Sequence, residues 1–267
     1  MNDSNHHILS VHDVTKVFEG IIALDHVSFK VTQGYIKALI GPNGAGKTTL
    51  LNAINGIVPP DGGKIFFDGH DVVRYSADRI AMLGISRTFQ LVRMVTINDA
   101  TVLDNVLLGA HMKLKPGLLE AIFRKGKVTA KESKARDKAM EILKFVGLEK
   151  AIDSTPGSLP FGNQRLMELA RALMTEPRML LLDEPASGLN NTEVESFARL
   201  LRSIRDMGIT ILLVEHNMKL VMDIADDIIV LDFGKKLAEG DPQTICTNPE
   251  VIQAYLGTKQ KECRFDQ

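Results

Sequence analysis

One stretch decides the fold of this chain: Gly41-Pro42-Asn43-Gly44-Ala45-Gly46-Lys47-Thr48-Thr49. It matches the phosphate-binding pattern G-x-x-x-x-G-K-[ST]. Before it, Tyr35 to Ile40 is a short apolar run that predicts a buried strand, and after it apolar residues recur at helical spacing as far as Ile57. A strand therefore enters a glycine-rich turn that opens a helix. The alternative is a purely structural glycine-rich turn, and the flanking strand and helix argue against it.

This loop has the chemistry to bind the phosphates of a nucleotide. Glycines let backbone N–H groups approach phosphate oxygens, and the start of the helix adds partial positive charge. Lys47 can reach the β- and γ-phosphates, and the Thr48 hydroxyl can ligate Mg²⁺. We therefore predict that residues 41–49 bind nucleotide.

The composition is that of an ordinary globular protein. The 267 residues are 45% apolar and 24% charged, and the net charge is −1, so no global field marks nucleic acid or anionic lipid as the partner. Cys246 and Cys263 lie outside any Cys–His motif, and we expect free thiols in a reducing cytoplasm. No apolar run reaches the length of about 18 residues that a membrane span needs. We expect a chain that does not cross a membrane by itself.

The segment before the loop predicts an antiparallel layer. Period-two patterning extends from Ile8 to Phe18 and from Ala23 to Val31, and residues 61–63 have the composition of a turn before a further strand at 64–67. Phe18 stands where an aromatic ring can stack on an adenine. A core phenylalanine on an edge strand is the equally open alternative.

The middle of the chain changes from strands to helices. Gly84 to Gln90 predicts a strand that ends in Gln90, and from Leu91 to about Pro156 helical periodicity takes over. Residues 111–138 include nine Lys or Arg and three acidic residues, an excess of six positive charges. A solvated helical hairpin explains this excess, and a basic face near anionic lipid or a membrane partner is the alternative.

After Asn163 an α/β pattern resumes. An apolar strand from Met179 ends in the adjacent carboxylates Asp183 and Glu184, and a second strand, 209–214, precedes His216. Asp183 would hold Mg²⁺ and Glu184 would orient or deprotonate the attacking water. Adjacent acids at a strand end are often only a helix cap, and a lone histidine is more often structural. Because the same chain contains a phosphate-binding loop, we favour a functional role for Asp183 and Glu184. Gln90 and His216 are further catalytic candidates for the same reason.

One more element completes a familiar order of motifs, Leu159-Pro160-Phe161-Gly162-Asn163-Gln164. With the loop at 41–49, Gln90, the strand ending in Asp183 and Glu184, and His216, the chain resembles ATP-binding cassette (ABC) transporter ATPases over essentially its full length. The resemblance implies a P-loop NTPase α/β fold with an antiparallel β subdomain and a helical insert. It implies a head-to-tail dimer, in which ATP lies between one P-loop and the signature motif, residues 159–164, of the second subunit. It also implies Mg²⁺ held by Thr48, Gln90 and Asp183.

Finer features resemble the subfamily that energises uptake of branched-chain amino acids. These are the segments 87–90, 187–190 and 214–218, the basic insert, and the tail Asn248-Pro249-Glu250-Val251-Ile252-Gln253-Ala254-Tyr255-Leu256-Gly257. Pro160 departs from the serine that is usual in the wider family, which leaves Gly162 to supply the backbone donor. Asn190 replaces the usual aspartate, a variant that the subfamily shares.

The resemblance implies a single ABC ATPase domain over residues 1–257, followed by a flexible tail (258–267). The domain consists of a core (1–90 and 157–240), a helical insert (about 91–156) and a C-terminal helix (248–256). It implies membrane permease subunits as partners, with surface positions near Arg87 and Arg93 facing them, and indirectly a solute-binding protein, but no nucleic acid. The expected location is the cytoplasm, at the inner face of the cell membrane. A lipopolysaccharide-type exporter ATPase, a soluble ABC ATPase acting on nucleic acid or ribosomes, and a simple P-loop kinase remain alternatives.

Overall fold

The computed structural model describes residues 6–88, 97, 99–113 and 130–256. Its strands are β1 (His7–Phe18), β2 (Ile21–Thr32), β3 (Ile36–Ile40), β4 (Gly62–Phe67), β5 (His70–Asp71), β6 (Ile85–Arg87), β7 (Met179–Asp183), β8 (Thr210–Val214), β9 (Asp227–Asp232) and β10 (Lys235–Gly240). Its α-helices are α1 (Lys47–Ile54), α2 (Ala77–Leu83), α3 (Val102–Leu107), α5 (Ala130–Phe145), α6 (Phe161–Met174), α7 (Asn191–Asp206), α8 (Met218–Ile224), α9 (Pro242–Thr247) and α10 (Pro249–Val251). Shorter helical turns are η2 (Leu108–Lys113), η3 (Glu149–Ala151), η4 (Pro156–Ser158) and the π-helical η5 (Ile252–Leu256).

The predicted antiparallel layer is a four-stranded sheet in the order β2-β1-β4-β5. Val27, Phe29 and Val31 are buried in alternation along β2, as the period-two pattern predicts. The prediction of a turn at residues 61–63 is wrong for two of them, because Gly62 and Gly63 belong to β4. An added Cβ on Gly63 would lie 2.4 Å from the Asp13 carbonyl oxygen, so glycine permits close pairing with β1 there.

The second sheet, called the core sheet below, has six strands in the order β10-β9-β3-β8-β7-β6. All neighbouring pairs in it are parallel except β9 with β10. Every residue of β3, β7 and β8 is buried, which explains their continuous apolar sequences. Parallel strands end at one edge of the sheet, so the segments that follow β3, β7 and β8 meet there.

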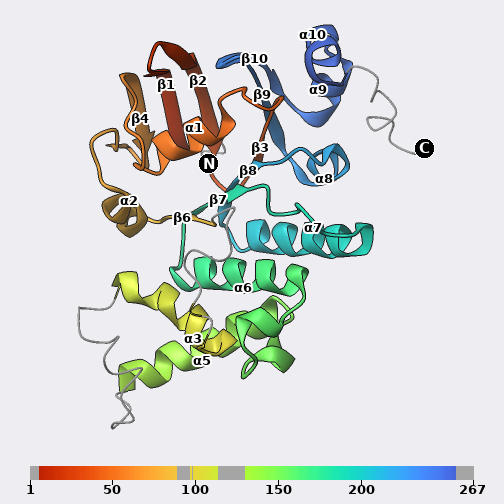
Figure 1. Cartoon of the computed structure of the whole chain (residues 1–267). Helices are drawn as coiled ribbons and strands as arrows, with labels where there is room; N and C mark the ends of the chain where they lie inside the picture. Colours follow the sequence, from red (N-terminus) through yellow and green to blue (C-terminus); the bar gives the residue numbers. More distant parts are fainter. Residues whose placement is uncertain (1–5, 89–96, 98, 114–129, 257–267) are drawn as a thin grey trace, which may run out of the picture.

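Three apolar clusters hold the layers together. One lies between the two sheets and includes α1, a second joins the other face of the core sheet to α3, α5, α6 and α7, and a third lies under α8, α9 and α10. In Figure 1 the antiparallel sheet lies at the top left, and α3, α5 and α6 form a separate group below the core sheet.

Between β6 and α6 the described residues form helical elements and no strand. Residues 114–129 lie outside the described ones, so both interpretations of the basic stretch remain predictions, as does the division into core, insert and tail. No helix among the described residues has both the length and the apolar character of a membrane span.

Candidate nucleotide-binding site

The glycine-rich loop joins β3 to α1, as predicted, and close packing requires glycine at two of its positions, Gly41 and Gly46. Gly41 has φ 150°, and an added Cβ would lie 2.1 Å from the Leu231 carbonyl oxygen. Gly46, directly before α1, has φ 99°, and its added Cβ would lie 2.5 Å from the Ala23 carbonyl oxygen. The backbone of β9 and β2 therefore shapes the loop, because no side chain fits at either position.

Lys47 places a cation inside this loop. Its ammonium donates to the carbonyl oxygens of Gly41 at 2.7 Å and Pro42 at 3.0 Å, and the residue is only 8% exposed. Burial lowers the pKa of Lys47, and the carboxylates of Glu184 and Asp183 act against that shift. The three side chains therefore share one electrostatic site at the edge of the core sheet.

Asp183, the last residue of β7, is buried and paired with Arg87. The Arg87 guanidinium donates to Asp183 Oδ2 at 2.8 Å and to Asn52 Oδ1 on α1 at 2.6 Å. The Arg87 side chain is 6% exposed. The charge of Arg87 is therefore used inside the core, and the expectation that surface positions near it face a permease stays a prediction. Arg93 lies outside the described residues.

The oxygens available beside the loop suit Mg²⁺. Asp183 Oδ1 accepts no hydrogen bond from the described residues, whereas Oδ2 accepts from Arg87. Thr48 follows Lys47 in the first turn of α1 and offers a hydroxyl. Mg²⁺ prefers such hard oxygen ligands, and it is usually held by one or two carboxylates together with substrate phosphates. No group of three or more His, Cys, Asp or Glu that could hold a metal occurs among the described residues.

Glu184 and His216 lie together after the ends of β7 and β8. Glu184 has φ 49°, and its N–H donates to the Val214 carbonyl oxygen at 2.9 Å. His216 Nδ1 lies 3.8 Å from Glu184 Oε2. The structure thus brings together two of the predicted catalytic side chains, while Gln90 lies outside the described residues.

Phe18 ends β1 and is 42% exposed. The interpretation of Phe18 as a core residue is therefore wrong. The Lys16 ammonium lies 5.3 Å from the centre of its ring. An exposed ring at the end of this strand is free to stack on a planar ligand.

The motif at 159–164 stands at the start of α6. Leu159 is extended, and Pro160 is the N-cap with φ −52° and no side-chain capping bond. Gly162 follows in the first helical turn, where backbone N–H groups have no carbonyl partner within the helix. The Gln164 side chain donates to the Leu159 carbonyl oxygen at 3.0 Å, which closes the turn.

Comparison with known proteins agrees with this geometry. The pattern of the ABC transporter family matches residues 24–187, and that of the branched-chain amino acid ATP-binding cassette transporter matches residues 235–260. The chain belongs to the ABC transporter family.

Its relatives include branched-chain amino acid transport ATP-binding proteins. The high-affinity branched-chain amino acid transport ATP-binding protein BraF of Pseudomonas aeruginosa is 41% identical over 251 residues, which cover 94% of this chain and 98% of BraF. LivG of Escherichia coli, which carries the same description, is 40% identical with the same coverage.

Solved structures show the same fold. MJ1267, an ATP-binding cassette of an ABC transporter in its ADP conformation, superposes with a TM-score of 0.83 at 32% identity, over 95% of this chain and 100% of that one. A dimeric post-hydrolysis structure of the cassette MJ0796, bound to ADP and Pi, reaches 0.73 at 27% identity, over 87% of this chain and 98% of that one. The predicted α/β fold with its antiparallel sheet is therefore confirmed.

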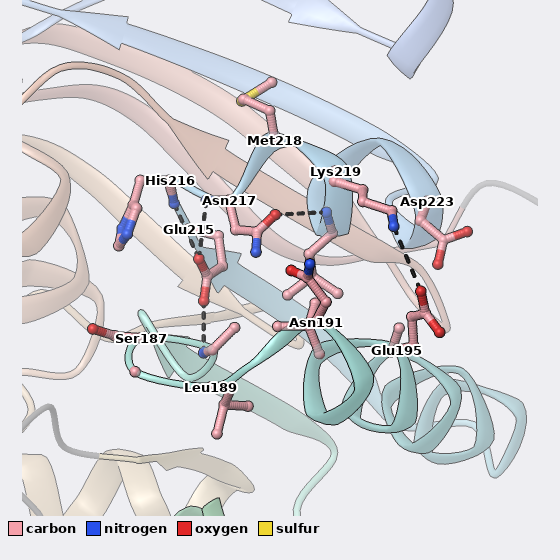
Figure 2. A pocket seen from close by; sticks show the side chains of 15 residues that line it. Ser187, Leu189, Asn191, Glu195, Glu215, His216, Asn217, Met218, Lys219 and Asp223 are labelled. Atoms are coloured by element: carbon pink, nitrogen blue, oxygen red, sulfur yellow. Dashed lines mark hydrogen bonds and ion pairs between the residues drawn. The ribbon is translucent and has the colours of Figure 1, made fainter. Parts of the chain in front are cut away.

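A pocket of the ABC core adjoins Glu184 and His216. It is lined by Ala186 to Leu189 before α7, by parts of α7, and by residues 215–220 and 223 of α8 and the segment before it, and it encloses about 480 Å³. Figure 2 shows Glu215 in its wall, with hydrogen bonds to the segments on either side. Burial raises the pKa of Glu215, and backbone N–H donors act in the opposite direction.

The sequence interpretation missed Arg87, Asn52 and Glu215 as site residues. Arg87 and Asn52 reach the site from β6 and α1, and only the folded arrangement brings them to Asp183. Glu215 directly precedes His216, which was the one available indication. No general rule assigns a role to the residue before a candidate histidine, so that indication was weak.

Proposed function

We propose that this chain is the ATP-hydrolysing subunit of an ABC importer that takes up branched-chain amino acids or a related small solute. The observation that carries this proposal is the match of residues 235–260 to the branched-chain amino acid family, together with full-length similarity to BraF and LivG. Separate permease subunits would carry the solute and a binding protein would deliver it. The subunit would work in the cytoplasm against the permeases at the inner face of the membrane.

Residues 41–49 bind the nucleotide phosphates in this proposal. The start of α1 offers backbone N–H groups to the phosphate oxygens, and the Lys47 ammonium exchanges its bonds with loop carbonyls for bonds to phosphate. Phe18 stacks on the adenine. Thr48 and Asp183, with Gln90, would hold Mg²⁺, which neutralises developing charge on the phosphates when it is bound.

Glu184 is the proposed base for hydrolysis. Its carboxylate accepts a proton from the attacking water while the water oxygen bonds to the γ-phosphorus. The bond between that phosphorus and the bridging oxygen of ADP breaks, and ADP and inorganic phosphate leave. His216, 3.8 Å away, senses the γ-phosphate and fixes the orientation of Glu184. Residues 159–164 of a second ATPase subunit, identical or different, cover the nucleotide, with the Gly162 N–H directed at the γ-phosphate.

Two substitutions test the proposal. Glu184→Gln keeps the shape but removes the base, so ATP should still bind while phosphate release falls about 10²- to 10⁴-fold. Lys47→Ala should instead weaken binding of a fluorescent ATP analogue, because it removes the cation inside the loop. Phosphate release by Glu184→Gln at the wild-type rate would refute the assignment of the base. Vesicles holding the cognate permeases should take up leucine with wild-type protein and not with Glu184→Gln.

A further inference from the structure

One buried carboxylate, that of Glu215, joins two segments that face the candidate site. Glu215 is 1% exposed. Its Oε1 accepts the N–H of Ala186 at 2.8 Å, while its Oε2 accepts the N–H of His216 at 3.1 Å and of Asn217 at 3.3 Å. The dashed lines in Figure 2 follow these bonds toward both segments. A single side chain therefore fixes the backbone after β7 relative to the backbone that carries His216.

The segment from Glu184 to Asn190 packs at its other end against the signature motif. Gly188 has φ 81°, and an added Cβ would lie 2.9 Å from Cε1 of Phe161. The side chain of Leu189 approaches Gly162, since an added Cβ there would lie 3.4 Å from Leu189 Cδ2. A shift of the signature motif would therefore change the packing of this segment.

A chain of contacts thus connects the signature to the catalytic residues of the same subunit. It leads from Phe161 through Gly188 and Ala186 to Glu215, and from there to His216, whose ring lies 3.8 Å from Glu184. In the proposed head-to-tail dimer the signature serves the ATP of the second subunit, whereas Glu184 and His216 serve the subunit's own ATP. The contacts therefore join one nucleotide site to the other.

We propose that Glu215 is a positioning residue, which sets the orientation of His216 and Glu184 according to the position of the segment 184–190. The inference rests on the proposed function, since it needs ATP at both sites. A carboxylate is required because both of its oxygens accept hydrogen bonds. An amide at the same place would turn one acceptor into an N–H that faces another N–H. One of the two segments would then be released.

The burial of Glu215 supports a role beyond packing. A carboxylate loses its hydration when it is buried, and the backbone donors around it offset only part of that cost. A role in packing alone would be served at lower cost by an apolar side chain of similar volume. The carboxylate of Glu195, in the same pocket, stays exposed and bonds Lys219 of α8 at 3.5 Å without joining the two segments.

The test compares Glu215→Gln with Glu195→Gln as the matched control. For Glu215→Gln we expect kcat for phosphate release to fall between about 10- and 100-fold, because a displaced catalytic group is that costly. The Kd for a fluorescent ATP analogue should stay within about twofold, because the phosphate-binding loop is untouched. Glu195→Gln should match wild type in both. A kcat for Glu215→Gln within about twofold of wild type would overturn the inference.

Hydrogen exchange gives a second measurement that does not depend on how well Glu215→Gln folds. In Glu184→Gln, which retains Glu215, added ATP should slow exchange of the amides at 186–189 and at 216–217 with the same ATP midpoint. Different midpoints for the two segments would overturn the coupling. Wild-type protein that neither binds nor hydrolyses ATP would instead refute the proposed function, so the two failures are distinguishable.

Discussion

At the scale of single residues, Pro160 is the clearest departure from the wider family. As the N-cap of α6 it leaves the first helical turn without a side-chain acceptor. A serine hydroxyl there would donate a charge-assisted hydrogen bond, worth about 1.5–3 kcal/mol, to the γ-phosphate bound by the second subunit. Proline instead lowers the entropy cost of ordering the backbone at this turn, by about 0.4–1 kcal/mol. Pro160→Ser should therefore tighten the ATP-bound dimer.

The measurement is ATP-dependent dimerisation by light scattering, with Pro160→Ser added to Glu184→Gln so that hydrolysis does not interfere. Glu184→Gln alone is the reference. Weaker association of the double variant would mean that the conformation preset by proline matters more than the missing hydroxyl.

A second prediction at this scale concerns a buried glutamate of α6. Glu168 is 3% exposed, and burial raises its pKa although Arg165 and Arg171 act in the opposite direction. The folded protein therefore binds this proton more tightly than the unfolded chain does. Below the pKa of an unfolded glutamate, about 4.3, protonated Glu168 makes its full contribution to the stability of the folded protein. This contribution is lost as pH rises through the raised pKa of Glu168 in the folded state.

Glu168→Gln cannot titrate, so it isolates this contribution. The free energy of unfolding of wild type minus that of Glu168→Gln should decrease as pH rises from about 4 to 7, by about 1.4 kcal/mol for each unit of pKa shift. Urea unfolding at several pH values measures it, with the exposed Glu195→Gln as control. A difference that is constant or grows with pH would contradict the prediction.

At the scale of elements, Gly109 sets how closely η2 approaches α6. An added Cβ would lie 2.2 Å from the Arg171 carbonyl oxygen and 2.8 Å from Met174 Cβ. Both are parts of a helix and cannot swing aside, so Gly109→Ala should cost about 1–3 kcal/mol. Gly157→Ala is the matched control, because its added Cβ meets nothing within 4 Å. Thermal unfolding checks both, and equal melting temperatures would show that the helices separate without cost.

The elements also show which parts of the fold a sequence can predict. The strand before Gly41 and the strand that ends in Asp183 are continuous apolar runs with a motif at the end, so both were predicted. The hairpin of β9 and β10 and the helix α9 were not. Residues 228–231 of β9 form a buried apolar run, but no motif follows it to indicate its place in the fold, and β10 has no buried residue in its six positions.

The candidate site divides in the same way. The loop at 41–49 and the Asp183–Glu184 pair are local in sequence and were predicted. The contact of Gly188 with Phe161 and the pair of Arg87 with Asp183 join residues far apart in the chain. Such pairs depend on how helices and strands pack, which local patterns do not encode.

At the scale of the whole molecule, one chain holds only half of each proposed ATP site. The phosphate-binding loop and Glu184 are at the edge of the core sheet, while the signature starts α6, which packs with α3 and α5. A head-to-tail dimer therefore predicts complementation between two inactive chains. Lys47→Ala loses the loop but keeps its signature. Gly162→Asp keeps the loop but sets a carboxylate against the γ-phosphate of the other subunit.

Each variant alone should hydrolyse almost no ATP. A mixture should recover activity, because the Gly162→Asp chain supplies Lys47 and the Lys47→Ala chain supplies Gly162 to the same nucleotide. The second site of that mixed dimer carries both defects and stays inactive, so the recovery is bounded by the one intact site. Phosphate release is the measurement. The new side chain of Gly162→Asp approaches Glu193, whose Oε1 would lie 3.0 Å from the added Cβ. The melting temperature of this variant must therefore first match that of wild type, which shows that the variant is folded. A mixture of folded chains no more active than its components would exclude a site built from two subunits.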